Sequence, residues 1–383
     1  MKKHLLSILL LLFPLLLKAQ VPESSHVVLV MEENHSYSSV IGSSSMPYLN
    51  SLASQYAVAT HYYANTHPSI GNYFMLTTGQ IITNDDEYSG TVDVDNIVRH
   101  MLSAGKTWKS YAESIPSVGY TGGDTGLYLR RHNPFSYLSD VVNSSAEKLN
   151  LVPFTQFTSD LNNNRLPDLS YIAPNINDDA HNGTLQEADA WLKKNIAPLF
   201  NNPDFQKDGI LIIVFDESFD SDTAEGGGHI PAVVVGPGVK KGFQSPTNYQ
   251  HQNTLRTILA ALGIDSYPGA AASAVPLGVF GSGSSGGGGG SGSSCSASAI
   301  GVTVCSPTAG ETSGSPVHFV ATAKASLPIT AMRIYVDGVS EYATSANSLN
   351  TDIAMAAGSH NVVVQAWDSA GAVFKNSMTI KVD

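Results

Sequence analysis

The chain has 383 residues, of which 42% are hydrophobic, and this is enough for one large domain and one small domain. Its formal net charge of -12 argues against a nucleic-acid partner, because binding a polyphosphate backbone needs a basic surface. The same charge leaves open a small phosphate substrate that is held by metal ions.

Residues 1–20 have the pattern of a secretory signal peptide. Lys2 and Lys3 form a basic start, Leu5 to Leu17 form an apolar run, and Ala19 is a small residue that suits cleavage. The apolar run is too short to span a bilayer. We therefore expect a bacterial protein that is secreted or periplasmic, with cell-surface association also open, and with no integral membrane segment after cleavage.

The body of the chain, residues 21–280, alternates apolar strand-like runs with helical stretches. Strands are expected at 26–31, 56–64, 107–113, 169–174, 209–217 and 230–237. Helices are expected at 46–55, 69–78, 93–104, 184–200 and 250–262. Continuous β-branched runs suit strands that are buried on both faces. The pattern predicts an α/β fold, a three-layer sandwich with a mostly parallel central sheet.

Polar residues follow three of these strands at their carboxyl ends, where ligands bind in open α/β sheets. They are the segments 32–36, 175–181 and 216–218. Carboxylates, an asparagine and imidazoles at one edge of a sheet suit a divalent metal ion.

The link between the strands expected at 209–217 and 230–237 is short, polar and rich in glycine. A parallel crossover needs a dozen or more residues and usually a helix. We therefore expect the second strand to run antiparallel to the first, which would place His229 beside Asp216.

Ser69 stands where the helix expected at 69–78 begins. One interpretation is a plain helix N-cap, which is a common role for serine. The other is a nucleophile, whose oxygen points to the place where the helix N-terminus attracts an anion. Metal ions could lower the pKa of such a serine and hold a phosphoryl group. Thr66 is a competing candidate.

A Gly/Ser-rich linker, 281–294, separates the body from a tail, 295–383. Short alternating strands in the tail predict an immunoglobulin-like β-sandwich, similar to the modules often appended to bacterial exported enzymes. It could be a spacer, or it could bind a surface or a glycan. In an exported protein, Cys295 and Cys305 would form a disulfide.

The body carries, in this order, the stretches VVLVMEENHSYSSVIG, THPSIGNYFMLTTG, YAESIP, LRRHNPFSY, YIAPNINDDAH, VFDES, HIPAVVVGPGVKKG and YQHQNTLRTILAALGI. Together they resemble the bacterial phosphoesterase family that contains acid phosphatases and non-haemolytic phospholipases C. This family belongs to the alkaline phosphatase superfamily, so the resemblance implies an alkaline-phosphatase-like fold. It covers about residues 26–280.

The resemblance also implies a set of site residues. Ser69 matches the nucleophile, which forms a phosphoserine, and Asn72 matches an asparagine that holds a phosphate oxygen. His132 matches a residue that contacts phosphate or protonates the leaving group. The implied metal ligands are Glu33, Asn34, Asp179, His181, Asp216, Glu217 and His229.

The sequence departs from the family pattern at two places. Gly71 stands where relatives often have proline, which would loosen the start of the helix. The stretch SFDSDTAEGGGH replaces the Gly-Gly-x-x-Asp-His of relatives. Asp220 and Asp222 are therefore either ligands of a second metal or residues of a solvated loop.

We therefore expect a monomeric, metal-assisted phosphoesterase with a divalent ion of the Zn, Ca or Mg type. An acid-phosphatase-type phosphomonoesterase is favoured because the body is compact, whereas the phospholipase C relatives are longer. A phospholipase C that cleaves phospholipid head groups is the alternative enzyme. An adhesion protein on a degenerate phosphoesterase body is the alternative of another class, and the intact set of Ser69, Asn72 and the acidic pair argues against it.

Overall fold

The computed structural model describes residues 21–281, 299–315, 317–344 and 347–383. They belong to two units that divide between Gly286 and Gly287. The stretch 1–20, nearly all of the linker and Cys295 lie outside the described residues. The signal peptide, the linker and the disulfide with Cys305 therefore stay predictions.

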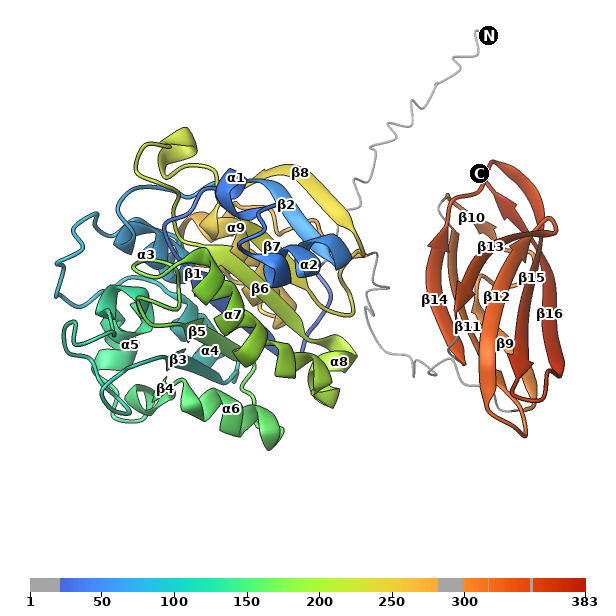
Figure 1. Cartoon of the computed structure of the whole chain (residues 1–383), viewed down its shortest axis with the longest axis horizontal. Coiled ribbons are helices and arrows are strands. Elements are labelled where there is room, and N and C mark those ends of the chain that lie inside the picture. The colour runs from blue at the N-terminus through green and yellow to red at the C-terminus, as the bar shows by residue number, and fades with distance from the viewer. Residues whose placement is uncertain (1–20, 282–298, 316, 345–346) are drawn as a thin grey trace, which may run out of the picture. The chain divides into compact units, whose positions relative to one another are not determined.

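The first unit is built on an eight-stranded sheet with the strand order β4-β3-β5-β1-β6-β7-β2-β8 (Figure 1). Every neighbouring pair is parallel except the two pairs of β7, which runs antiparallel to β6 and to β2. The predictions of a mostly parallel sheet and of an antiparallel β7 are therefore confirmed. The strands are β1 (Val27–Glu32), β2 (Ala57–Tyr62), β3 (Trp108–Ala112), β4 (Leu151–Pro153), β5 (Leu169–Ala173), β6 (Ile210–Phe215), β7 (Ala232–Val235) and β8 (Phe243–Tyr249).

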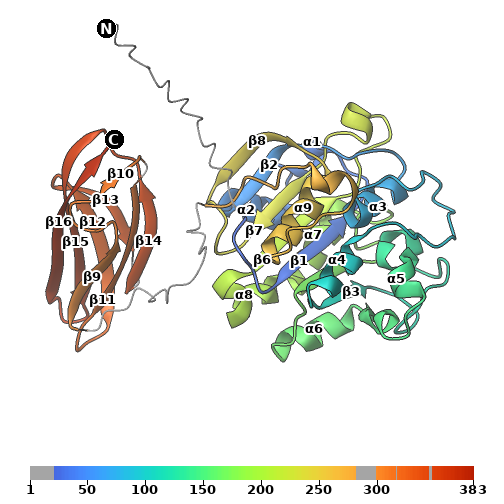
Figure 2. The same cartoon turned by 180° about the vertical axis from the view of Figure 1, so that it is seen from behind.

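Helices cover both faces of this sheet. One face carries α2 and α7, which lie in front in Figure 1, and the other carries α3, α4 and α9, as Figure 2 shows from behind. The predicted three layers are therefore present. The helices are α1 (Tyr37–Val40), α2 (Pro47–Gln55), α3 (Ile70–Thr78), α4 (Ile97–Ser103), α5 (Ser139–Val142), α6 (Thr155–Asn162), α7 (Leu185–Asn195), α8 (Pro203–Asp208) and α9 (His251–Ala261).

Several elements differ from the sequence prediction. Strands β4 and β8 and helices α1, α5, α6 and α8 were not expected. The helix expected at 184–200 ends at Asn195, and a 3₁₀ turn with Pro198 follows over Ala197–Asn201. Proline has no backbone N–H and disfavours a helical residue before it, so α7 stops there.

Strands β1 and β6 form the centre of the sheet, and all of their residues are buried. They are neighbours in a parallel register that pairs Val30 with Ile213 and Glu32 with Phe215. Both strands therefore end at the same level, and the residues that follow them begin side by side.

The second unit is all-β, as predicted. It contains a five-stranded sheet, β10-β16-β15-β12-β13, and a three-stranded sheet, β14-β11-β9, and its strand pairs are antiparallel except β10 with β16. The immunoglobulin-like topology stays a prediction. The strands are β9 (Gly301–Ser306), β10 (Thr312–Ser313), β11 (Val317–Lys324), β12 (Ile329–Val336), β13 (Val339–Thr344), β14 (Ser348–Ile353), β15 (Gly358–Asp368) and β16 (Val373–Val382).

A search of the described residues for membrane-spanning helices finds none that combines the required length with the required hydrophobicity.

Candidate active site

The polar segments that follow β1, β5 and β6 meet at the carboxyl edge of the sheet. The register of β1 with β6 places Glu33 beside Asp216. The Asp216 N–H donates to the carbonyl of Glu32 at 2.9 Å, and the Glu33 N–H donates to the carbonyl of Asp179 at 2.8 Å. Backbone hydrogen bonds therefore fix the acidic residues of three segments relative to one another.

Ser69 lies where α3 begins, and its hydroxyl turns away from the helix. Across the described chain it makes no capping hydrogen bond to a backbone amide of α3. Its Oγ instead lies 3.3 Å from Oε2 of Glu33 and 3.3 Å from Oε1 of Glu217. The side chain is only 3% exposed. The plain N-cap interpretation therefore does not describe this serine, because its oxygen faces carboxylates.

The acidic pair after β6 is crowded with negative charge. Oδ1 of Asp216 accepts from the Asn34 N–H at 3.0 Å, whereas buried Oδ2 has no hydrogen-bond partner among the described residues. Burial, followed by the charge of Glu33, raises the pKa of Asp216 well above its usual range. Burial, followed by the charge of Asp216, raises the pKa of Glu217 to about 10. Carboxylates in such a place are costly without a cation.

His132 bridges two buried carboxylates. Its Nε2 lies 2.7 Å from Oε1 of Glu33, and its Nδ1 lies 3.0 Å from Oδ2 of Asp179. Burial opposes the charge of the imidazolium, but Glu33 and Asp179 outweigh it and raise the pKa of His132 to about 10. Burial likewise opposes the charge of Glu33, and His132 outweighs it and lowers the pKa of Glu33 to about 2. His132 therefore lies between Glu33 and Asp179 and can orient both carboxylates, although among the described residues its Nε2 meets Glu33 at ion-pair distance without a well-aligned hydrogen bond.

The donor set fits a divalent metal ion. Glu33 and Glu217 flank the Ser69 oxygen, and the unpaired Oδ2 of Asp216 belongs to the same cluster. Two groups place one ligand atom per residue within 4.8 Å of one another, and they are Glu33–His132–His181 and His67–Glu217–Asp220. Carboxylates combined with imidazoles are ligands that divalent cations of this kind accept.

Two further predicted residues shape the backbone around this cluster. Asn34 has a left-handed φ of 56°, and its N–H donates to Asp216. The fully buried Asn72 side chain accepts from the N–H groups of Asn65, at 2.9 Å, and Thr66, at 3.2 Å, and donates to the Thr66 carbonyl. Asn72 therefore holds the loop that leads to Ser69 in this structure.

Of the two remaining predicted ligands, His181 lies at the rim of the acidic cluster and His229 lies outside the cluster. The His181 ring is 5.8 Å from that of His132, so it reaches the site. The His229 ring instead stacks with Tyr37 at 4.5 Å and Tyr63 at 5.0 Å, and its Nε2 lies 2.9 Å from the Thr60 carbonyl. The antiparallel β7 begins at the expected edge, but a bridge with Tyr63 turns His229 toward β2 instead of Asp216.

The structure adds three residues that the sequence did not single out. His67 Nδ1 lies 2.9 Å from Oε2 of Glu217. The Tyr73 hydroxyl donates to Oε1 of Glu33 at 2.7 Å. Glu32 is fully buried, and neither of its carboxylate oxygens has a partner within the described residues. Tyr73 could have been found, because it follows Ser69 by four residues and so faces the same way on a helix.

The glycine-rich link after Glu217 packs directly against the loop that leads to Ser69. Gly226 and Gly228 have positive φ values of 114° and 83°. A Cβ at Gly226 would collide with the Asn65 carbonyl, and a Cβ at Gly227 would collide with the Thr66 carbonyl. Within the link, Asp222 accepts from the His229 N–H at 3.0 Å, so it organises the loop. Gly226–Gly228 is called the glycine turn below.

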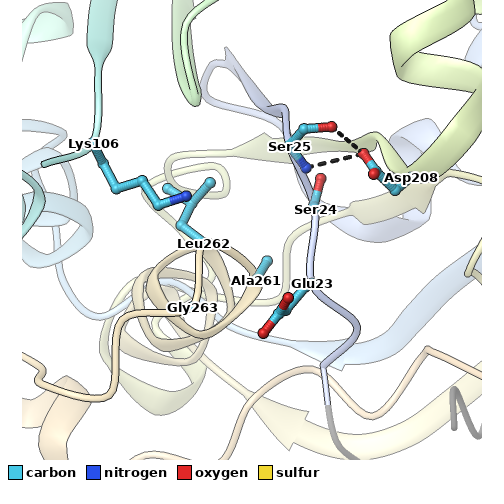
Figure 3. Close-up of a pocket in the computed structure, with 8 residues that line it drawn as sticks. All are labelled: Glu23, Ser24, Ser25, Lys106, Asp208, Ala261, Leu262 and Gly263. Carbon is cyan, nitrogen blue, oxygen red and sulfur yellow. Dashed lines mark hydrogen bonds between the residues drawn. The ribbon is translucent and has the colours of Figure 1, made fainter. Parts of the chain in front are cut away.

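A cavity of about 450 Å³ lies at the opposite edge of the sheet (Figure 3). Ser25, Lys106 and Asp208, which line it, precede β1, β3 and β6 and so belong to the amino ends of these strands. The Ser25 N–H and hydroxyl both donate to Asp208. The cavity is therefore separate from the Ser69 cluster, whose chemistry lies at the carboxyl ends.

Known proteins resemble this chain in sequence. The model of the family described as Phosphoesterase family matches residues 43–265. The phosphatidylinositol-3-phosphatase of Mycobacterium tuberculosis is 33% identical over 259 residues, which are 67% of this chain and 82% of that protein. A probable acid phosphatase of Kluyveromyces lactis is 31% identical over 61% of this chain and 56% of that protein, so the chain spans little more than half of the yeast relative.

A structural neighbour is a protein in the alkaline phosphatase superfamily from Vibrio parahaemolyticus, with 12% identity, a TM-score of 0.47 and coverage of 67% of this chain and 71% of that one. The sequence matches define this chain as a hydrolase that acts on phosphoric esters. It belongs to the Phosphoesterase family, as the resemblance of its motifs implied.

Proposed function

We propose that the protein is a secreted or periplasmic, metal-assisted phosphomonoesterase of the acid phosphatase type, with Ser69 as its nucleophile. The observation that carries this proposal is the Ser69 hydroxyl, which makes no capping bond to its own helix among the described residues and lies between Glu33 and Glu217. Relatives named phosphatidylinositol-3-phosphatase and acid phosphatase support a phosphatase over a phospholipase C. Export rests on the signal-peptide pattern of residues 1–20.

The chain's own residues suggest the order of events. The Ser69 oxygen attacks phosphorus, and the bond to the leaving alcohol oxygen breaks. The serine proton passes to the ionised carboxylate of Glu33, whose Oε2 is 3.3 Å away, and goes from there to the leaving oxygen. Water then cleaves the bond between phosphorus and the serine oxygen, which releases inorganic phosphate and restores the hydroxyl. Phosphorus therefore passes through a phosphoserine, and no redox partner is needed.

Glu33, Asp216 and Glu217 would hold the divalent ion, with Asn34 beside them. When bound, the ion would neutralise the phosphoryl oxygens and favour the ionised serine. His132 would keep Glu33 in place from one side, and Tyr73 would do so from the helix.

Phosphate release from an aryl phosphomonoester by the full chain tests this proposal. We expect Ser69→Ala to lower kcat/KM by on the order of a thousandfold or more, because the covalent step is lost. Thr66→Ala is the matched control, since it removes a hydroxyl that accepts from Asn84 and donates to the His67 carbonyl. It should keep most of the activity.

Each other outcome selects a different conclusion. Turnover that survives in Ser69→Ala but disappears in Thr66→Ala would move the nucleophile to Thr66. Cleavage of a phosphocholine diester without turnover of the monoester would identify a phospholipase C. An absence of both activities in protein that retains its metal would favour a binding protein.

A further inference from the structure

Residues 81–86, here called the cap segment, lie against the start of α3. The Asn84 amide donates to the Thr66 hydroxyl at 2.9 Å, and Oδ1 of Asp86 accepts from the Ile70 N–H at 3.2 Å. The cap segment can pack this closely because residue 71 is glycine, since a Cβ there would lie only 2.5 Å from Oδ1 of Asn84. The Asp86 carboxylate therefore accepts a hydrogen bond from the backbone amide that directly follows Ser69.

Arg131 approaches the same carboxylate. Its Nε lies 3.7 Å from Oδ2 of Asp86, and its Nη1 lies 3.0 Å from Oδ2 of Asp124. The Arg131 side chain is 14% exposed, and its buried Nε makes no hydrogen bond to the residues that the structure describes. The Arg131 guanidinium therefore faces the same Asp86 carboxylate that accepts from the Ile70 N–H beside Ser69.

Asp86 thus makes the contacts that a phosphoryl oxygen would seek, namely an amide at a helix N-terminus and a guanidinium. Ile70 directly follows Ser69, so its amide lies one residue from the attacking oxygen, and a phosphoryl group there can use this amide only if Asp86 leaves it. The anion and the Asp86 carboxylate cannot both occupy this place, since like charges at contact distance repel strongly.

We propose that Asp86 is a built-in substitute for the phosphoryl group, and that an incoming phosphomonoester displaces it to bind the Ile70 N–H and Arg131. The inference rests on the proposed function and deepens it by naming residues that select the substrate. A dianionic monoester competes with Asp86 better than a monoanionic diester, because the released amide and guanidinium attract the greater charge more strongly.

Calorimetric binding of inorganic phosphate to the full chain, with its metal as purified, tests this inference without turnover. Asp86→Ala should bind phosphate on the order of tenfold more tightly, because one charged competitor is removed. Adding Arg131→Gln to Asp86→Ala should abolish that gain. The matched control is Asp85→Ala, because Asp85 is exposed and its Oδ1 accepts from the Glu87 N–H at 3.1 Å.

Phosphate affinity that is unchanged or weaker in a folded Asp86→Ala variant would overturn the inference and leave Asp86 as a helix cap. If Asp86→Ala does not fold, Asp86→Asn replaces it, because the amide oxygen can still accept from Ile70 while the charge is gone. Asp86→Asn should then tighten phosphate binding, and no tightening would again reject the inference. Because binding needs no nucleophile, failure of the Ser69→Ala test would leave these outcomes interpretable.

Discussion

Asp216 is the member of the acidic pair after β6 whose charge the protein itself compensates less. One of its oxygens accepts a single backbone hydrogen bond from Asn34, and the other has no partner in the described part of the chain. Residues arranged for function in this way often lower the stability of the fold. The cost at Asp216 should therefore depend on whether a cation is bound.

Replacing Asp216 with asparagine should stabilise the metal-free protein. Without metal, the buried Asp216 carboxyl must either keep its charge beside Glu33 or take up a proton at neutral pH. Asparagine avoids both costs and should raise the free energy of unfolding by about 1–2 kcal/mol. With a divalent ion at a hundredfold excess over its Kd, the wild type should gain about 2.7 kcal/mol, and Asp216→Asn should gain much less. Thermal unfolding with chelator and with added metal measures both effects.

Asp265→Asn is the control, because Asp265 is an exposed carboxylate after the end of α9. It should leave both unfolding midpoints close to those of the wild type. An Asp216→Asn protein that melts below the wild type in chelator would show that the carboxylate is stabilising even without metal.

Sequence patterns identified the acidic pair and Ser69 because each follows a strand or opens a helix that the hydrophobic pattern reveals. The positions of His67, Asp86 and Arg131 are not linked to the end of a predicted strand or the start of a predicted helix. His67 meets Glu217 across 150 positions of the chain, and the Asp86–Arg131 pair depends on how two irregular segments fold over α3. Such contacts are set by tertiary packing, which periodicity does not encode.

One buried carboxylate contributes polar contacts that join α6 to β3. Asp160 accepts from Lys109 at 2.6 Å, from the Tyr111 hydroxyl at 2.8 Å and from Gln156 at 2.8 Å. Burial opposes its charge, but these donors outweigh burial and hold the pKa of Asp160 below its ordinary 3.8. The carboxylate therefore contributes stability only while it is ionised.

Asp160→Asn should destabilise the first unit, which contains helices α1 to α9, in a pH-dependent way. Because the folded pKa is depressed, the stabilisation is complete above the unfolded pKa and is lost as the pH falls through the folded pKa. We expect a loss of about 1–2 kcal/mol at pH 7 that shrinks below about pH 4. Urea unfolding followed by the helical circular-dichroism signal, from neutral to acidic pH, measures this difference. A difference that grows on acidification would contradict the assignment.

The strands of the first unit differ in how well the sequence predicts them. The runs of β1 and β6 are buried throughout, so unbroken apolar sequence marks them. Strand β4 has three residues, and β8 alternates irregularly between buried and exposed positions and contains Pro246. These segments become strands because they pair with a neighbouring strand, and their local sequence does not predict that pairing.

Each of the two units has its own hydrophobic core in the described chain. One core is formed by residues between Val21 and Phe280, and the other by residues between Val302 and Val382. Units with separate cores can in principle fold alone. The proposed chemistry uses residues of the first unit only.

Removal of residues 287–383 should therefore leave kcat/KM for a small aryl phosphate within about twofold of the full-chain value. The complementary fragment, residues 287–383, should show a cooperative thermal transition of its own and no turnover. A drop of more than about tenfold in the shortened enzyme would mean that the second unit supports the active site or its fold.

The glycine turn has a consequence for how this enzyme tolerates mutation. Gly226 and Gly227 bear no reactive group, yet each leaves only enough room for the backbone carbonyl of the loop before Ser69. A single added methyl group would push this loop away and shift Ser69 relative to Glu33 and Glu217. In a random-mutagenesis library, substitutions at these positions should therefore inactivate the enzyme as often as we expect at Ser69. Such a loss of function would come from a displaced active-site loop and not from the loss of a reacting group.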